Sequence, residues 1–107
     1  MVKYTNERVM KSLRKYLKRV SKHITIDKII LFGSRARGDY FLDSDVDLII
    51  ISKDFKNIDF RERMSMLLDF WDEPIDLEVI GYTPEEFEKK KKQIGIVKTA
   101  VKEGIEI

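Results

Sequence analysis

Cysteine is absent from the 107-residue sequence, and the only histidine is His23. Without cysteine, the chain has neither a disulfide framework nor a zinc site with thiolate ligands. A single histidine rules out a metal site built from a cluster of histidines and argues against a conventional Ser-His triad. These absences exclude thiol chemistry and histidine-cluster chemistry as the basis of a function.

No apolar run approaches the roughly 20 residues that a membrane-spanning helix needs. The N-terminal stretch MVKYTNERV lacks the apolar core of a signal peptide, so we expect a cytoplasmic protein without a membrane partner. A strong excess of one charge is also missing, because 21 Lys and Arg residues face 19 Asp and Glu residues, for a net charge of +2. The overall charge therefore does not favour direct nucleic-acid binding, although a local basic face remains open.

The composition is that of a globular protein, with 43% hydrophobic and 37% charged residues. A chain of this length suits one domain, which we predict to span residues 1–107. It buries roughly 65% of its unfolded surface, which is enough for one modest core.

Hydrophobic periodicity predicts amphipathic helices over residues 5–22 and 59–71. Apolar, β-branched runs predict strands over 26–32 and 45–51, and an alternating pattern predicts a third strand over 75–80. Within the first helix, Thr5 is the expected N-cap. Within the second helix, five residues are expected to face inward: Phe60, Met64, Leu67, Leu68 and Trp71.

The C-terminal third predicts two helices and a short strand. The run Thr83-Pro84-Glu85-Glu86 has the pattern of a capping box with proline at the first helical position. A second short helix is expected after Gly95, with Gly104 at its end, and residues 105–107 are expected to add an edge strand. The resulting order of interspersed helices and strands predicts an α+β fold.

Carboxylates recur at alternate positions of two predicted strands. Asp45 and Asp47 point to the same side, with Cα atoms roughly 6.6 Å apart, and Asp76 and Glu78 repeat the pattern. If the two strands are neighbours, three or four carboxylates gather on one surface. Such a cluster needs hard cations, and oxygen ligands suit Mg²⁺ or Mn²⁺. Two such ions are the usual device for phosphoryl transfer.

The connection over residues 33–44 supplies groups that suit phosphate. Gly33 permits close approach of a ligand, and Ser34 offers a hydroxyl and an N–H at the start of a possible short helix. Arg35 and Arg37 carry guanidinium forks that fit phosphate oxygens, although a plain surface loop would also explain them. We therefore predict that these four residues bind the phosphates of a nucleoside triphosphate.

The spacing of Gly33-Ser34, ten residues, and Asp45-Val46-Asp47 resembles the GS-x10-D-x-D signature of the minimal nucleotidyltransferases in the DNA polymerase β superfamily. The resemblance covers nearly the whole chain and implies a mixed sheet with helices on one side. It also implies that Asp45 and Asp47 bind two Mg²⁺ ions, with Asp76 as the third metal-site carboxylate that helps to deprotonate the attacking hydroxyl. Glu78 shares the face of Asp76 and competes for that role.

Members of this group resemble the antitoxins of HEPN/MNT toxin–antitoxin pairs. The resemblance implies that the chain moves AMP from ATP onto a tyrosine of a partner HEPN-domain ribonuclease. An alternative is a non-catalytic, nucleotide-binding antitoxin that masks its partner stoichiometrically. A third hypothesis is a nucleic-acid binder that uses the basic face of the first helix. Two further features stay open: Asp39 and Asp43 suit loop acids, and the apolar trio Tyr40-Phe41-Leu42 suits packing or a partner contact.

Overall fold

The computed structural model describes residues 3–107, so Met1 and Val2 of the N-terminal stretch considered above lie outside the described residues. The order of the elements follows the sequence prediction, with a short helix added after β1 and a 3₁₀ turn added after β2. The elements are α1 (Asn6–Val20), β1 (Lys28–Phe32), α2 (Ser34–Arg37), β2 (Val46–Ile51), η1 (Lys53–Phe55), α3 (Phe60–Asp69), β3 (Leu77–Tyr82), α4 (Pro84–Lys90), α5 (Ile96–Glu103) and β4 (Ile105–Glu106). The predicted α+β class is confirmed.

The four strands form one mixed sheet in the order β3-β2-β1-β4. β1 pairs antiparallel with both β2 and β4, whereas β2 and β3 are parallel. Parallel neighbours need a crossover connection, and here the chain from β2 to β3 passes through α3. The condition for the carboxylates to gather is therefore met: the two carboxylate-bearing strands are neighbours, with Asp47 directly opposite Glu78.

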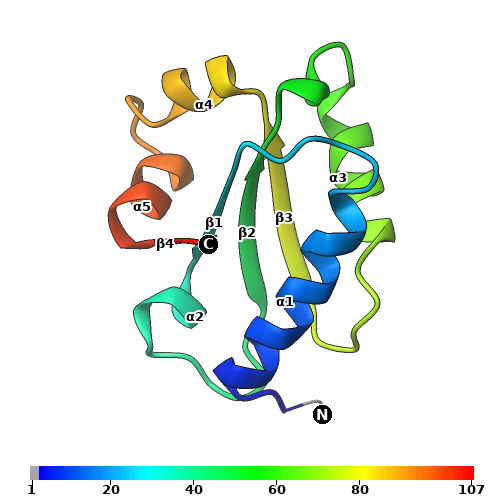
Figure 1. Ribbon diagram of the computed structural model, residues 1–107. Helices are drawn as coiled ribbons and strands as arrows, with labels where there is room; N and C mark the ends of the chain where they lie inside the picture. The colour runs from blue at the N-terminus through cyan, green and yellow to red at the C-terminus, as the bar shows by residue number, and fades with distance from the viewer. Residues whose placement is uncertain (1–2) are drawn as a thin grey trace.

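Apolar side chains cover both faces of the sheet. On one face, residues such as Leu48 pack with α1 and α3, and on the other face residues such as Ile49 pack with α4 and α5. Figure 1 shows α1 and α3 on one side of the sheet and α4 and α5 on the other. The expectation of helices on one side only is wrong, because Ile49 and Ile51 make the second face of β2 apolar as well. No helix among residues 3–107 is long and apolar enough to cross a membrane.

The inward face of α3 differs from the predicted one. Leu67 is fully buried, but the side chains of Phe60 and Leu68 are 39% and 44% exposed. Arg63 is buried in their place. The expectation that Phe60 and Leu68 face inward is wrong, because Arg63 turns a polar side chain toward the sheet and shifts the buried stripe of the helix.

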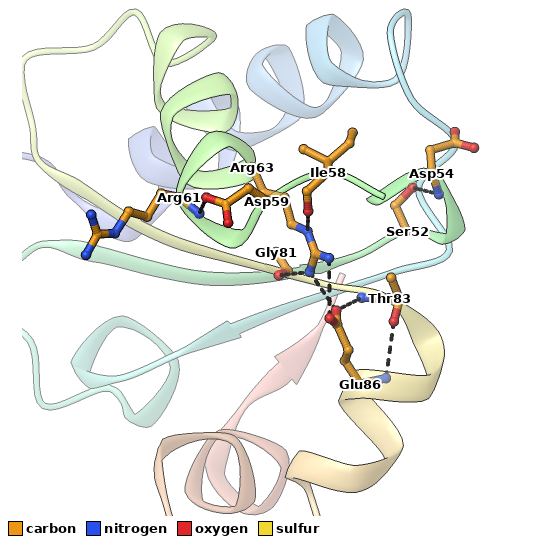
Figure 2. A network of polar contacts seen from close by, with 9 residues as sticks. All are labelled: Ser52, Asp54, Ile58, Asp59, Arg61, Arg63, Gly81, Thr83 and Glu86. Carbon is orange, nitrogen blue, oxygen red and sulfur yellow. Dashed lines mark hydrogen bonds and ion pairs between the residues drawn. The ribbon is translucent and has the colours of Figure 1, made fainter. Parts of the chain in front are cut away.

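Arg63 connects α3 to two other elements, as Figure 2 shows. Its guanidinium donates hydrogen bonds to the carbonyls of Ile58 and Gly81, at 2.8 and 3.3 Å, and pairs with Glu86 at 2.6 Å. Glu86 also accepts a hydrogen bond from the Thr83 N–H, while the Thr83 side chain accepts from the Glu86 N–H. The predicted capping box is confirmed, and its glutamate serves the buried arginine at the same time.

Replacing Glu86 by Gln is expected to lower the free energy of unfolding by about 2 kcal/mol, because it removes the counter-charge of a buried guanidinium. Urea unfolding measures the change. The matched control is Glu88→Gln, since Glu88 pairs with Lys91 on the surface. That exposed pair should contribute less than about 1 kcal/mol. Equal losses in the two variants would contradict a stabilising role for the Arg63–Glu86 pair.

Candidate active site

The site is built where the end of β1 meets the starts of β2 and β3. Gly33 follows β1 with φ +73°, a backbone conformation that favours glycine. A Cβ atom at this position would collide with the Asp47 carboxylate. Gly33 therefore lets the turn before α2 pass directly beside a β2 carboxylate.

Two pairs of carboxylates lie at the same end of β2 and β3. Asp45 immediately precedes β2 and Asp47 lies on it, whereas Asp76 immediately precedes β3 and Glu78 lies on it. The parallel register aligns the pairs, because Asp47 is opposite Glu78 and the Asp76 carbonyl accepts a hydrogen bond from the Val46 N–H at 2.9 Å. Alternation along each strand then directs the carboxylates of both pairs to one face of the sheet.

Burial, together with the crowding of like charges, raises the pKa values of Asp45 and Asp47. Burial raises the pKa of Asp47 to about 7, with further contributions from a hydrogen bond and charge repulsion with Glu78 and from the charge of Asp45; Arg37 opposes the shift. Burial also raises the pKa of Asp45, and the negative charges of Asp76 and Glu78 add to the effect. When its carboxylates are ionised, the site therefore carries more negative than positive charge.

An open hollow of about 460 Å³ lies over these groups. Its lining is Gly33, Ser34, Arg37, Asp43, Ser44, Asp45, Asp47 and Glu78. The turn predicted to hold phosphates thus shares one hollow with Asp45 and Asp47, two of the three carboxylates predicted to hold metal. Asp43, interpreted from the sequence as a loop acid, and Ser44 were missed; only their positions next to Asp45 could have indicated them. Asp76 is not among the lining residues, whereas its competitor Glu78 is.

Arg35 occupies a different environment from the one predicted. Its side chain is 1% exposed, and its guanidinium donates only to neutral oxygens of the protein. The expectation that Arg35 binds the nucleotide is therefore wrong for this structure, because all five N–H donors of its guanidinium already bind oxygens of the protein.

Arg37 remains at the hollow. It pairs with Asp39 at 3.2 Å and with Glu103, at the end of α5, at 3.3 Å. Both carboxylates are solvent-exposed, and such pairs contribute little stability. Arg37 can therefore exchange these partners for phosphate oxygens at small cost.

The donor chemistry of the hollow fits a divalent cation. Carboxylate oxygens are the ligands that Mg²⁺ and Mn²⁺ prefer, and a cation would offset both the burial and the charge repulsion that raise the pKa values of Asp45 and Asp47. Within residues 3–107, however, no three His, Cys, Asp or Glu side chains already lie in a metal-ligating arrangement. Metal binding would therefore require these carboxylate side chains to turn toward one point.

The raised pKa of Asp47 is expected to make the protein less stable as the pH rises from about 4 to neutrality. Between the ordinary value of 3.8 and about 7, the folded protein keeps a proton that the unfolded chain has released, so the stability of the wild type falls across this range. In metal-free buffer at pH 8, the free energy of unfolding of Asp47→Asn is therefore expected to exceed that of wild type by about 1 kcal/mol, a value that allows for solvent screening. Urea unfolding measures the difference. The gain should vanish near pH 4. A gain of the same size at both pH values would contradict the assignment.

Comparisons with known proteins point to one family. The family model described as "Nucleotidyltransferase domain" matches residues 10–106. Two proteins of Methanocaldococcus jannaschii, each named "Putative protein adenylyltransferase", match parts of the chain. The first is 36% identical over 56 residues, which are 52% of this chain and 56% of that protein. The second is 65% identical over 26 residues, which are 24% of this chain and 26% of that protein. These alignments span about half and about a quarter of the relatives.

A solved structure shares the fold. It is described as a "putative nucleotidyltransferase from Sulfolobus solfataricus", and it superposes with a TM-score of 0.67. The comparison covers 94% of this chain and 80% of the other, at 24% sequence identity. At that identity the likeness shows the common fold.

Proposed function

We propose, from the premise that this chain belongs to the nucleotidyltransferase domain family, that it transfers the AMP group of ATP to a hydroxyl group of a protein. One observation carries the proposal. The Gly33-Ser34 turn and the carboxylates of Asp45, Asp47 and Glu78 line the same hollow. Groups for a phosphate chain and groups for its cations are thus within one site, as transfer from a nucleoside triphosphate requires.

Each group then has a definite task. The Gly33 backbone and the Ser34 hydroxyl receive the triphosphate, and Arg37 adds a guanidinium to its oxygens. Asp45 and Asp47, with a carboxylate of β3, would hold two Mg²⁺ ions, or Mn²⁺ in their place. When bound, these ions supply neutralisation of phosphate charge and a lower pKa for the attacking hydroxyl.

The transfer forms one bond and breaks another. The acceptor oxygen attacks the α-phosphorus, the bond from that phosphorus to its bridging oxygen breaks, and pyrophosphate leaves with the electron pair. The proton of the hydroxyl passes to a carboxylate of β3. Family resemblance favours Asp76 as the group that accepts this proton. Glu78 is favoured by its own position, because Glu78 lines the hollow. Comparison of Asp76→Asn with Glu78→Gln would identify the base, because only its loss should remove the acidic limb of the pH–rate profile, where the rate falls as the base is protonated.

The proposed acceptor is a tyrosine of a HEPN-domain ribonuclease, which the modification would silence. Two features support a protein acceptor. The names of the two Methanocaldococcus jannaschii relatives refer to protein adenylylation. The hollow is also open and lined by polar and charged residues, without the apolar walls that most small-molecule sites have.

Nucleotide binding is tested by thermal unfolding. ATP with Mg²⁺ is expected to stabilise the protein by about 2.7 kcal/mol at a hundredfold excess over Kd, because ligand binds only the folded state. ATP with EDTA should stabilise it much less, since the carboxylates then repel the triphosphate. An unchanged melting temperature in millimolar MgATP would contradict both a catalytic and a regulatory nucleotide site.

A further inference from the structure

One side chain ties the loop that delivers Asp45 to the segment before α1. Arg35 donates from Nε and Nη2 to the Ser44 carbonyl, at 3.2 and 3.0 Å, and from Nη2 to the Leu42 carbonyl at 3.1 Å. Its Nη1 donates to the Tyr4 carbonyl at 2.8 Å and to Asn6 Oδ1 at 3.2 Å. The start of the chain around Tyr4 and Asn6 and the loop after α2, which are distant in sequence, thus meet at one guanidinium.

Further contacts close the same arrangement. The Asn6 side chain donates back to the Arg35 carbonyl at 3.1 Å, and the Tyr4 N–H donates to the Leu42 carbonyl at 2.6 Å. The Tyr40 ring lies over the guanidinium, with 4.7 Å from Cζ to the ring centroid. The loop from residue 40 to residue 44 is consequently held along its length.

Burying the charged guanidinium of Arg35 to hold this loop has an unfavourable free energy. None of its hydrogen-bond partners is a carboxylate, so the charge of Asp43 offsets only part of the cost of burying the guanidinium. Five hydrogen bonds from a charged donor offset that cost. The geometry has a local consequence, because the Ser44 carbonyl that Arg35 holds twice belongs to the residue directly before Asp45.

We propose that Arg35 is a positioning residue for the AMP transfer: by holding the Ser44 carbonyl against the segment before α1, it sets where Asp45 enters the hollow. The inference rests on the proposed function. Arg35 acts through the backbone of the loop and does not touch the nucleotide. Its loss should therefore weaken MgATP binding without removing any group that contacts MgATP.

The test compares two buried arginines. Arg35→Lys keeps the charge but loses the fork that reaches several carbonyls at once. Arg63→Lys is the matched control, because Arg63 is also buried and also binds carbonyls, but at the opposite end of β3. Isothermal titration with MgATP, below the melting temperature of both variants, separates positioning from general destabilisation. Hydrogen exchange over residues 41–45 reports the loop directly.

Arg35→Lys is expected to weaken MgATP binding by about tenfold, the lower end of the loss for residues that orient metal ligands, and to speed exchange over residues 41–45. Arg63→Lys should bind MgATP as wild type does. In an Asp45→Asn background, Arg35→Lys should cost no further affinity, since both changes act through one carboxylate. Should Arg35→Lys fail to fold, Asn6→Ala removes one acceptor of the guanidinium and is expected to change binding in the same direction.

The outcomes distinguish the two proposals. Wild-type affinity in Arg35→Lys, or an equal loss in Arg63→Lys, would overturn the positioning role while leaving the proposed function intact. A wild-type protein that does not bind MgATP would overturn the proposed function itself, and the role of Arg35 with it.

Discussion

Replacing Asp47 by Asn is expected to lower the rate of AMP transfer by at least about 100-fold, while the variant remains folded. The carboxylate lies in the hollow opposite Glu78 and beside the Gly33 turn, where its charge would balance the cations on the triphosphate. Asp45→Asn should have a similar effect. Transfer is measured with ATP labelled at the α-phosphate, and folding is checked by thermal unfolding in metal-free buffer.

The control is Asp72→Asn, which removes an exposed carboxylate that does not line the hollow. Asp72→Asn should leave the transfer rate unchanged, since the loss of one surface charge outside the hollow has little effect on the reaction. If Asp45→Asn or Asp47→Asn kept nearly wild-type activity, the interpretation of these residues as the ligands of two catalytic metal ions would be wrong.

A sub-stoichiometric amount of the protein, with MgATP, is expected to silence a HEPN-domain ribonuclease almost completely. One enzyme molecule modifies many acceptors, whereas a masking protein can inhibit only one partner per copy. Mass spectrometry of the tyrosine peptide of the ribonuclease should show added AMP. Asp47→Asn should bind the ribonuclease but leave it active and unmodified when present in trace amounts.

The same experiment separates the enzyme from the masking alternative. Neutralisation that needs one copy per ribonuclease, proceeds without ATP and adds no mass would favour a stoichiometric antitoxin. The exposed side chains of Phe41 and Leu42, at 76% and 44%, lie in the loop that leads to Asp45. Asp substitution of Phe41 would show whether this loop contributes to docking in either case.

Local patterns in the sequence were sufficient for most of the fold. The Thr5 N-cap and the Thr83–Glu86 capping box were predictable because a cap depends on residues within one turn of each other. The common face of Asp45 and Asp47 followed in the same way from the two-residue repeat of a strand. These features need no knowledge of distant parts of the chain.

Pairing between distant segments could be predicted only conditionally. The sequence showed that Asp76 and Glu78 share a face, but the parallel pairing of β2 with β3 decided that Glu78 lies opposite Asp47. A shift in strand register changes which side chains are neighbours without changing either strand's own pattern. The place of α4 and α5 on the second face was missed for a related reason, because most of the sheet residues that they cover belong to β1 and β2, which are distant from them in sequence.

The sequence by itself singled out Gly33, Ser34, Asp45 and Asp47 as the candidate site, because their type and spacing are local properties, and the structure brings them to one hollow. Only the tertiary structure decided the direction of the arginines. An arginine near a predicted site has five donors that suit phosphate and backbone carbonyls equally well. Arg35 turned inward because the carbonyls of Tyr4, Leu42 and Ser44 converge around it, and that convergence exists only once the segment before α1 has folded against the loop after α2.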